Sequence, residues 1–146
     1  MNKSEILHLI KDKLSAKVLN LERLIAETRA SNNETKSSMG DKFETSREMV
    51  QQEINTLQIQ LNENLQALNS LKKINTNLHQ TIGLGSLLET DKGFFYIAVS
   101  LGEINFNESK IFVISTESPL GKILLGRKKG EEITLNTIKQ KIINIW

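Results

Sequence analysis

The sequence predicts an α+β protein, in which an antiparallel coiled-coil helical hairpin precedes a small antiparallel β domain with one short helix. The first observation is compositional. Residues 4–81 contain no Pro, only Gly40 and only one aromatic residue, Phe43, whereas the other seven Gly, the only Pro and nearly all aromatic residues follow. The second is a change of apolar spacing, from a helical period to short runs typical of strands. We therefore expect a hairpin over 1–80 and a second domain over 81–146.

Length and composition limit the class of protein. A chain of 146 residues has room for one or two small domains, and its net charge of +2 is too small to indicate nucleic-acid binding by itself. The absence of cysteine excludes disulfides and thiolate metal sites. Since no long apolar run occurs and charges interrupt the amino terminus, the sequence predicts neither a membrane span nor a signal peptide. We expect a cytoplasmic protein without a membrane partner.

Two apolar stripes predict the arms of the hairpin. Off the stripes stand Lys, Glu, Asn, Gln and Ser, so each helix alone would expose an apolar face, and the two helices are expected to pack together. The intervening "ASNNETKSSMGDK" has the composition of a turn and places the tip near residues 32–44. Arms of about 27 to 34 residues would reach roughly 40–50 Å. The stripes comprise Leu7, Ile10, Leu14, Val18, Leu21, Leu24, Ile25 and Thr28, then Val50, Ile54, Leu57, Leu61, Leu65, Leu68, Leu71, Ile74 and Leu78.

The second part of the chain reads as short strands around one helix. "GSLLET" and "GFFYIAVS" flank a hairpin signal at Asp91-Lys92, and "KIFVIS", "EITL" and "IKQKIINIW" follow. In the last run, alternate residues from Ile138 to Trp146 are expected on one half-buried face. A short helix is predicted with Ser118 as N-cap, Pro119 at its first position and Gly126 after its end. The expected core aromatics are Phe94, Phe95, Tyr96, Phe106, Phe112 and Trp146.

A family resemblance lies in "ISTESPLGKILLGRKKGEEI", residues 114–133. It resembles the carboxy-terminal signature of the Gre transcript-cleavage factors, approximately I-S-x-x-S-P-L-G-x-A-L-L-G-x-x-x-G-D-x-V, without gaps. The order of the parts and "IAETR" at 25–29 are also similar to the family. The resemblance implies a GreA/GreB-like elongation factor with an FK506-binding-protein-like (FKBP-like) second domain.

The resemblance also implies partners and site residues. Gre-like proteins bind bacterial RNA polymerase, and their hairpin enters the secondary channel toward the RNA 3′ end. There, two tip carboxylates help to hold the second Mg²⁺ of the polymerase active centre. Here Gly40-Asp41 and Glu44 match the family's tip pattern, so Asp41 and Glu44 are the predicted catalytic and metal-directed pair, with Glu34 as a third candidate. Ser118, Pro119 and Leu120 are the predicted polymerase-binding residues.

On this hypothesis the chain is not itself an enzyme, binds no cofactor tightly and assists the polymerase nuclease. We expect it to be a monomer.

The tip residues also allow other interpretations. Asp41-x-x-Glu44 is a capping-box-like pattern that would serve the second helix alone. The tip departs from the family pattern at Lys42, Thr45 and Glu48, and matching it requires about eight extra residues before Gly40. A channel-binding regulator without cleavage therefore stays open, as does an FKBP-like isomerase or scaffold, which only fold analogy suggests. Likewise, Ser118 to Leu120 would form a packed helix start whether or not they bind polymerase.

Overall fold

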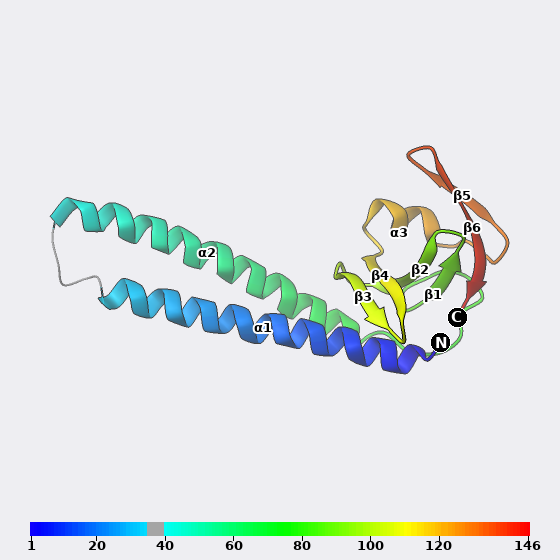
Figure 1. Ribbon diagram of the computed structural model, residues 1–146, viewed down its shortest axis with the longest axis horizontal. Helices are drawn as coiled ribbons and strands as arrows, with labels where there is room; N and C mark the ends of the chain where they lie inside the picture. The colour runs from blue at the N-terminus through cyan, green and yellow to red at the C-terminus, as the bar shows by residue number, and fades with distance from the viewer. Residues whose placement is uncertain (35–39) are drawn as a thin grey trace. The chain divides into compact units, whose positions relative to one another are not determined.

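The computed structural model describes the backbone of residues 1–34 and 40–146 (Figure 1), and the side chains of residues 32–45 lie outside the described part. Contacts divide the chain into two compact units. One contains Asp12–Asn69, and the other contains Met1–Lys11 together with Ser70–Trp146. The predicted boundary between residues 80 and 81 stays a prediction.

The first unit is the predicted helical hairpin. Helix α1 spans Lys3–Glu34 and helix α2 spans Gly40–Leu71. Asn2 caps α1, since its Oδ1 accepts from the backbone N–H groups of Ser4 (3.0 Å) and Glu5 (3.3 Å). The two apolar stripes pack against each other in one core, which confirms the prediction that the helices pair. Each helix thereby buries an apolar face that would otherwise be exposed to water. The core contains Val18, Leu21, Ile25, Ile54 and Leu61, with Val50, Leu57 and Leu68 packed against it.

Helix α2 ends earlier than its apolar spacing predicts. The stripe was expected to continue to Leu78, but the helix stops at Leu71 and Leu78 is 78% exposed. Two tighter backbone bonds close the last turn, from Lys73 N to Ser70 O and from Ile74 N to Leu71 O. Asn75 Oδ1 then accepts from the N–H of Asn77 at 3.0 Å. Such Asn turns compete with helical hydrogen bonding, so this segment is not helical although its apolar spacing continues to Leu78.

The second unit contains a six-stranded sheet of order β3-β4-β2-β1-β6-β5. Every pair is antiparallel, as predicted, except that β2 and β4 run parallel. The exception arises because β3 occupies the edge and β4 returns between β3 and β2. Pairing between strands that are not consecutive leaves no local signal in the sequence. The strands are β1 Leu87–Thr90, β2 Gly93–Ala98, β3 Gly102–Phe106, β4 Ser109–Ser115, β5 Glu132–Leu135 and β6 Ile138–Ile145.

Two-residue turns connect three strand pairs. The predicted Asp91-Lys92 turn joins β1 to β2, with Thr90 opposite Gly93. The turns at Asn107-Glu108 and Asn136-Thr137 both have positive φ at their two central residues, as type I′ hairpins require. Strand β3, which precedes the first of these, was not among the predicted strands.

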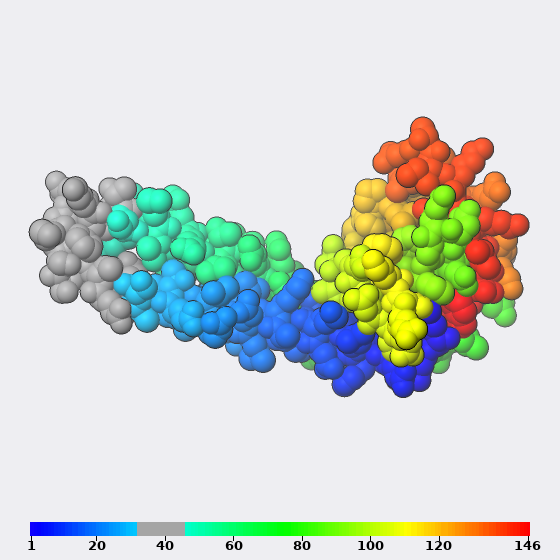
Figure 2. Space-filling view, in the orientation of Figure 1, coloured from blue at the N-terminus to red at the C-terminus, as the bar shows by residue number. Residues whose placement is uncertain are grey.

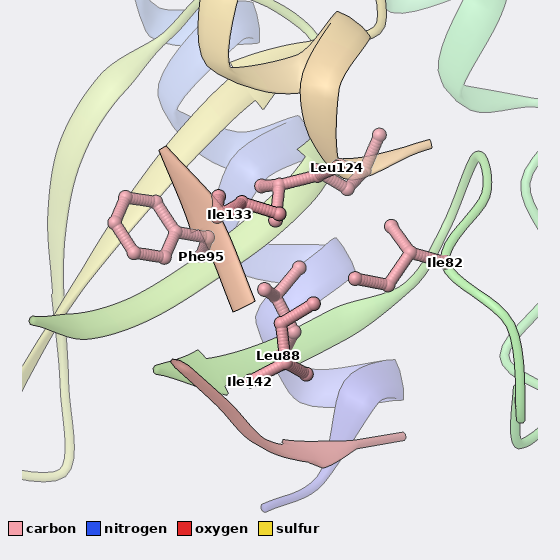
Figure 3. Packing of buried hydrophobic residues seen from close by; sticks show 7 residues of the cluster. Ile82, Leu88, Phe95, Leu124, Ile133 and Ile142 are labelled. Carbon is pink, nitrogen blue, oxygen red and sulfur yellow. The ribbon is translucent and has the colours of Figure 1, made fainter. Parts of the chain in front are cut away.

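The sheet core lies beneath helix α3, Pro119–Leu124 (Figure 3). Strand β6 contributes Ile142, but a register shift opposite Glu89 and Thr90 leaves Ile143 unpaired. Ile145 therefore packs against the core. Of the residues predicted to alternate on one face, Gln140 and Ile142 are buried, whereas Ile138 is exposed. The core cluster contains Ile82, Leu88, Phe95, Ile97, Leu124, Ile133 and Ile142.

The predicted aromatic core is smaller than expected. Phe95 and Tyr96 are buried, whereas Phe112 is 37% exposed beside Phe95, with ring centroids 5.8 Å apart. The other three aromatic residues are half-buried. Aliphatic side chains from every strand supply the rest of the buried surface.

The first turns of α1 belong to the β unit. Ile6, Leu7 and Ile10 are buried, and so is Lys3, whose Nζ donates to the backbone oxygens of Asn77 (2.6 Å) and Trp146 (3.1 Å). Lys3 thus joins the start of the chain to the segment before β1 and to the residue after β6.

Candidate functional site

The first candidate site is the start of α3, where Ser118 acts as the predicted N-cap. Its Oγ accepts from the N–H of Gly121 (3.0 Å) and donates to the backbone oxygen of Ser115 (2.8 Å). Its backbone is extended, with φ −66° and ψ 154°, and Pro119 follows at the first helical position. Pro fits there because that N–H has no helical partner and its fixed φ suits a helix. The helix therefore begins at this Ser-Pro pair because of interactions within the segment Ser115–Gly121 itself.

Gly121 allows α3 to lie directly on the preceding strand. A Cβ at this position would lie 2.1 Å from the backbone oxygen of Ser115 and 2.8 Å from Ser118 Oγ. Both distances are shorter than van der Waals contact, and the nearer atom is backbone that no rotamer change moves. The motif Ser118-Pro119-Leu120-Gly121 thus encodes a cap, a helix start and a close contact.

Exposure separates the three predicted polymerase-binding residues. Pro119 is exposed, whereas Ser118 and Leu120 are half-buried. Leu120 also packs against the sheet core, so part of its side chain stabilises the fold. At the other end, Gly126 has φ +82° and its N–H donates to the oxygen of Ile82 at 2.8 Å. The structure brings Ser118, Pro119 and Leu120 together on one turn, and their binding role stays a prediction.

The second candidate site is the end of the hairpin. Glu34 is the last residue of α1, and Asp41 and Glu44 are the second and fifth residues of α2. The carboxyl groups of all three lie outside the described side chains, so both the metal-directed and the capping interpretations stay open. Among the side chains that the structure describes, no group of three His, Asp or Glu is arranged to hold a metal ion.

A polar cluster that sequence reasoning missed lies before β1. His79 Nδ1 is 2.6 Å from Ser86 Oγ, which also accepts from the N–H of Gly83 at 2.9 Å. With the ring proton on Nε2, the Ser86 hydroxyl donates to His79 Nδ1. Burial, and then the positive charge of Lys3, hold the pKa of His79 below its usual value. Burial likewise lowers the pKa of Lys3. Because Ser86 is fully buried, this cluster fastens the segment rather than presenting a nucleophile.

A family model and several solved structures are similar to this chain. Residues 87–146 match the family model described as transcription elongation factor, GreA/GreB, C-term. The solved structures that this chain matches include the GreA factor homolog 1 (Gfh1) protein of Thermus thermophilus. It is 18% identical, with 93% of this chain and 94% of that chain covered and a TM-score of 0.37. Thermus aquaticus Gfh1 is 20% identical, with 92% of each chain covered and a TM-score of 0.37. No curated protein sequence matches significantly.

The family match includes the whole of the motif at residues 114–133 that carried the resemblance. Its range begins at the first residue of β1 and contains all six strands and α3. Of the described helices, none is long and apolar enough to cross a membrane. The resemblance is confirmed: residues 87–146 match the GreA/GreB carboxy-terminal domain, and this part of the chain is GreA/GreB-like.

Proposed function

We propose that this protein binds bacterial RNA polymerase, enters its secondary channel with the α1–α2 hairpin and stimulates cleavage of backtracked RNA. The observation that carries the proposal is the combination of a GreA/GreB carboxy-terminal domain with a long two-helix hairpin that has acidic residues next to its connection. Within the hairpin unit, residues 12–34 and 40–69 form arms roughly 35–45 Å long. Arms of that length suit a narrow channel.

The proposed chemistry belongs to the complex rather than to this chain. Hydrolysis of an RNA phosphodiester by two metal ions needs hard oxygen ligands around the second cation. Asp41 and Glu44 are proposed to supply carboxylates to the polymerase Mg²⁺, with Glu34 as a third candidate. Two or three acids on a free hairpin would bind Mg²⁺ weakly, so no tightly bound cofactor is proposed. The chain acts as an assistant to the polymerase nuclease.

Ser118, Pro119 and Leu120 are proposed to dock the second domain on the polymerase. Pro119 offers exposed apolar surface, and the Ser118 cap together with the Gly121 contact holds the turn rigid. A rigid, partly apolar turn loses little conformational entropy when it binds.

A second candidate function is a channel-binding regulator that does not cleave. The observation in its favour is the chemistry around the acids: Lys42 and Thr45 stand where the family pattern has Leu and Asn, and Glu48 stands at its Tyr position. These changes alter charge and shape at the end of the hairpin. In this case Asp41 and Glu44 cap α2 or contact polymerase without acting on its Mg²⁺.

Transcript cleavage in stalled, backtracked polymerase complexes separates the two functions. The RNA is labelled at its 5′ end, and shortening is followed with Mg²⁺, with and without the protein. We expect faster shortening with the wild type, and a loss of about tenfold or more in the rate for Asp41→Asn combined with Glu44→Gln. Glu53→Gln, an exposed acid further along α2, is the matched control and should cleave normally.

Binding to the same complexes is measured separately. Binding without shortening by the wild type would favour the regulator, whereas no binding would reject both functions. Equal cleavage by the wild type and the double variant would remove Asp41 and Glu44 from the mechanism.

A further inference from the structure

The β unit carries an uneven distribution of charge, although the net charge of the whole chain is only +2. Residues 118–130, which comprise α3 with its N-cap and most of the loop that follows (Figure 1), contain four Lys or Arg and no Asp or Glu. All four cationic side chains are exposed. Among the described residues, none of the four forms an ion pair. We call these residues the basic patch: Lys122, Arg127, Lys128 and Lys129.

Hydrogen bonds within the β unit hold the basic patch together. Arg127 Nε donates to the backbone oxygen of Ile123 at 3.2 Å, so the Arg127 side chain lies over the last turn of α3, which also carries Lys122. The next residue, Lys128, forms an antiparallel bridge with Thr81 in the segment before β1. The loop is therefore fastened to α3 on one side and to this segment on the other.

Two acidic residues follow the basic patch, and each faces another group. Glu131 Oε2 accepts from the backbone N–H of Lys128 at 2.8 Å, so its carboxylate is turned to the backbone of the loop. Glu132 lies opposite Lys141 in the pairing of β5 with β6. Even with both acids counted against the four cations, residues 118–132 keep a formal charge of +2.

The chemistry of this surface fits the phosphate backbone of a nucleic-acid duplex. Duplex DNA carries one negative charge about every 1.7 Å along its axis, which is dense enough to give each of several clustered cations a phosphate. Gln80 and Thr81 are exposed, and side chains of these types commonly donate to phosphate oxygens. Single strands are usually bound by stacking their bases on aromatic side chains. Residues 72–86 and 118–130 contain no Phe, Tyr or Trp, and this favours a duplex.

We propose that the basic patch binds the phosphate backbone of duplex DNA without reading its sequence. This inference goes beyond the proposed function, which concerns polymerase and RNA, and does not depend on it. Arg127 uses its Nε within the fold, which leaves the terminal N–H groups of its guanidinium for phosphate oxygens. The three lysines add compact positive charges. Because contacts to phosphate carry no sequence information, the binding is weak, independent of sequence and sensitive to salt.

The test compares two double variants of the full-length chain. Lys128→Gln with Lys129→Gln removes two charges from the basic patch, whereas Lys13→Gln with Lys17→Gln removes two exposed charges from α1. Both variants have the same net charge, so an effect of net charge alone would change both equally. Binding to a fluorescein-labelled DNA duplex of mixed sequence is followed by fluorescence anisotropy between about 25 and 150 mM salt. Circular dichroism checks that both variants are folded.

We expect the logarithm of the wild-type binding constant to fall with the logarithm of salt concentration with a slope of about −3 to −4. The patch variant should reduce that slope by about 2 and weaken binding at the lowest salt about tenfold or more, whereas the α1 variant should stay within about twofold of the wild type.

Equal effects of the two variants, no effect of either, or no binding by the wild type at the lowest salt would overturn the proposal. Tighter binding to one strand of the same DNA would also overturn it, because the duplex would then not be the ligand. Poly-glutamate that competes as well as unlabelled duplex at equal charge would assign the patch to an acidic protein instead. Since the assay contains no polymerase, none of these outcomes bears on the proposed function.

Discussion

At Gly121, the addition of a single methyl group should clearly lower the free energy of unfolding. A Cβ there would lie 2.1 Å from the backbone oxygen of Ser115, so Gly121→Ala must push α3 away from β4. We expect a loss of about 1–3 kcal/mol in the free energy of unfolding, measured by urea denaturation. Gly83→Ala is the control, because nothing lies within 4 Å of its Cβ, and it should be close to neutral. Equal stability of the two variants would refute the close contact.

Tyr96 is a buried residue whose hydroxyl has no hydrogen-bond partner among the described residues. Burial raises its pKa to about 12. Since a buried polar group without a partner costs free energy, Tyr96→Phe should leave stability unchanged or raise it by up to about 1 kcal/mol. Tyr96→Leu, which also loses the ring, should destabilise. A clear loss of stability in Tyr96→Phe, by urea denaturation, would mean that the hydroxyl is bonded in solution.

His79 should make stability depend on pH. Its pKa is lowered in the folded state by burial and by Lys3, so the unfolded chain binds the proton first as pH falls. Its contribution to stability is therefore complete above about pH 6.5 and is lost as pH falls through the folded pKa. Thermal unfolding between pH 7.5 and 5 should show a smaller decline in Tm for His79→Gln than for the wild type. The control His8→Gln, exposed on α1, should keep the decline.

At the scale of elements, Asn64 interrupts the apolar seam of the hairpin. It continues the spacing of Ile54, Leu57 and Leu61, and it lines a hollow of about 310 Å³ with Lys17, Asn20, Leu21 and Gln60. Its Nδ2 donates to the oxygen of Gln60 in its own helix, at 2.7 Å. Asn64→Leu should therefore bury apolar surface against α1 and stabilise the chain by about 1 kcal/mol. Asn62→Leu, on the exposed side, should not, and equal denaturation midpoints would contradict this packing.

Elements whose signals are local were predictable from the sequence. The two apolar stripes, the Asp91-Lys92 turn and the Ser118 cap each depend on residues a few positions apart. Strand β3 was missed because Ile104 is its only fully buried residue and the following Asn107-Glu108 turn contains no Gly. The parallel pairing of β2 with β4 and the irregularity at Ile143 arise from contacts across the sheet.

In the candidate sites, too, local features could be predicted from the sequence and contacts between distant residues could not. Ser118 could be identified as a cap, but the contact between Gly121 and Ser115 depends on how α3 lies on β4. The hydrogen-bond partners of Lys3 are 74 and 143 positions away from it in the sequence. No local sequence pattern predicts such distant partners. His79 was assigned to the hairpin arm because the apolar spacing continues to Leu78. In the structure it instead forms a hydrogen bond with Ser86, next to β1.

At the scale of the whole molecule, the β unit includes the beginning of the chain. Residues Met1–Lys11 group with Ser70–Trp146, and they contribute the buried side chains of Ile6, Leu7 and Ile10 as well as the Lys3 hydrogen bonds. Burial of three aliphatic side chains contributes roughly 4–9 kcal/mol, which is comparable with the total stability of a small domain. The family-matched residues alone should therefore be a marginal fold.

We expect residues 70–146 alone to lack a cooperative thermal transition by circular dichroism, or to melt far below the full chain. A second chain joins residues 1–11 to 70–146 by a flexible Gly/Ser linker and lacks the hairpin arms. It should recover the transition, because the β unit needs the first turns of α1 but not the hairpin arms. Ile6→Asp in the linked chain should abolish the recovery, since it buries a charge without a partner. If residues 70–146 melt at the same temperature with and without residues 1–11, the amino terminus belongs to the hairpin alone. The β unit would then be independent of it.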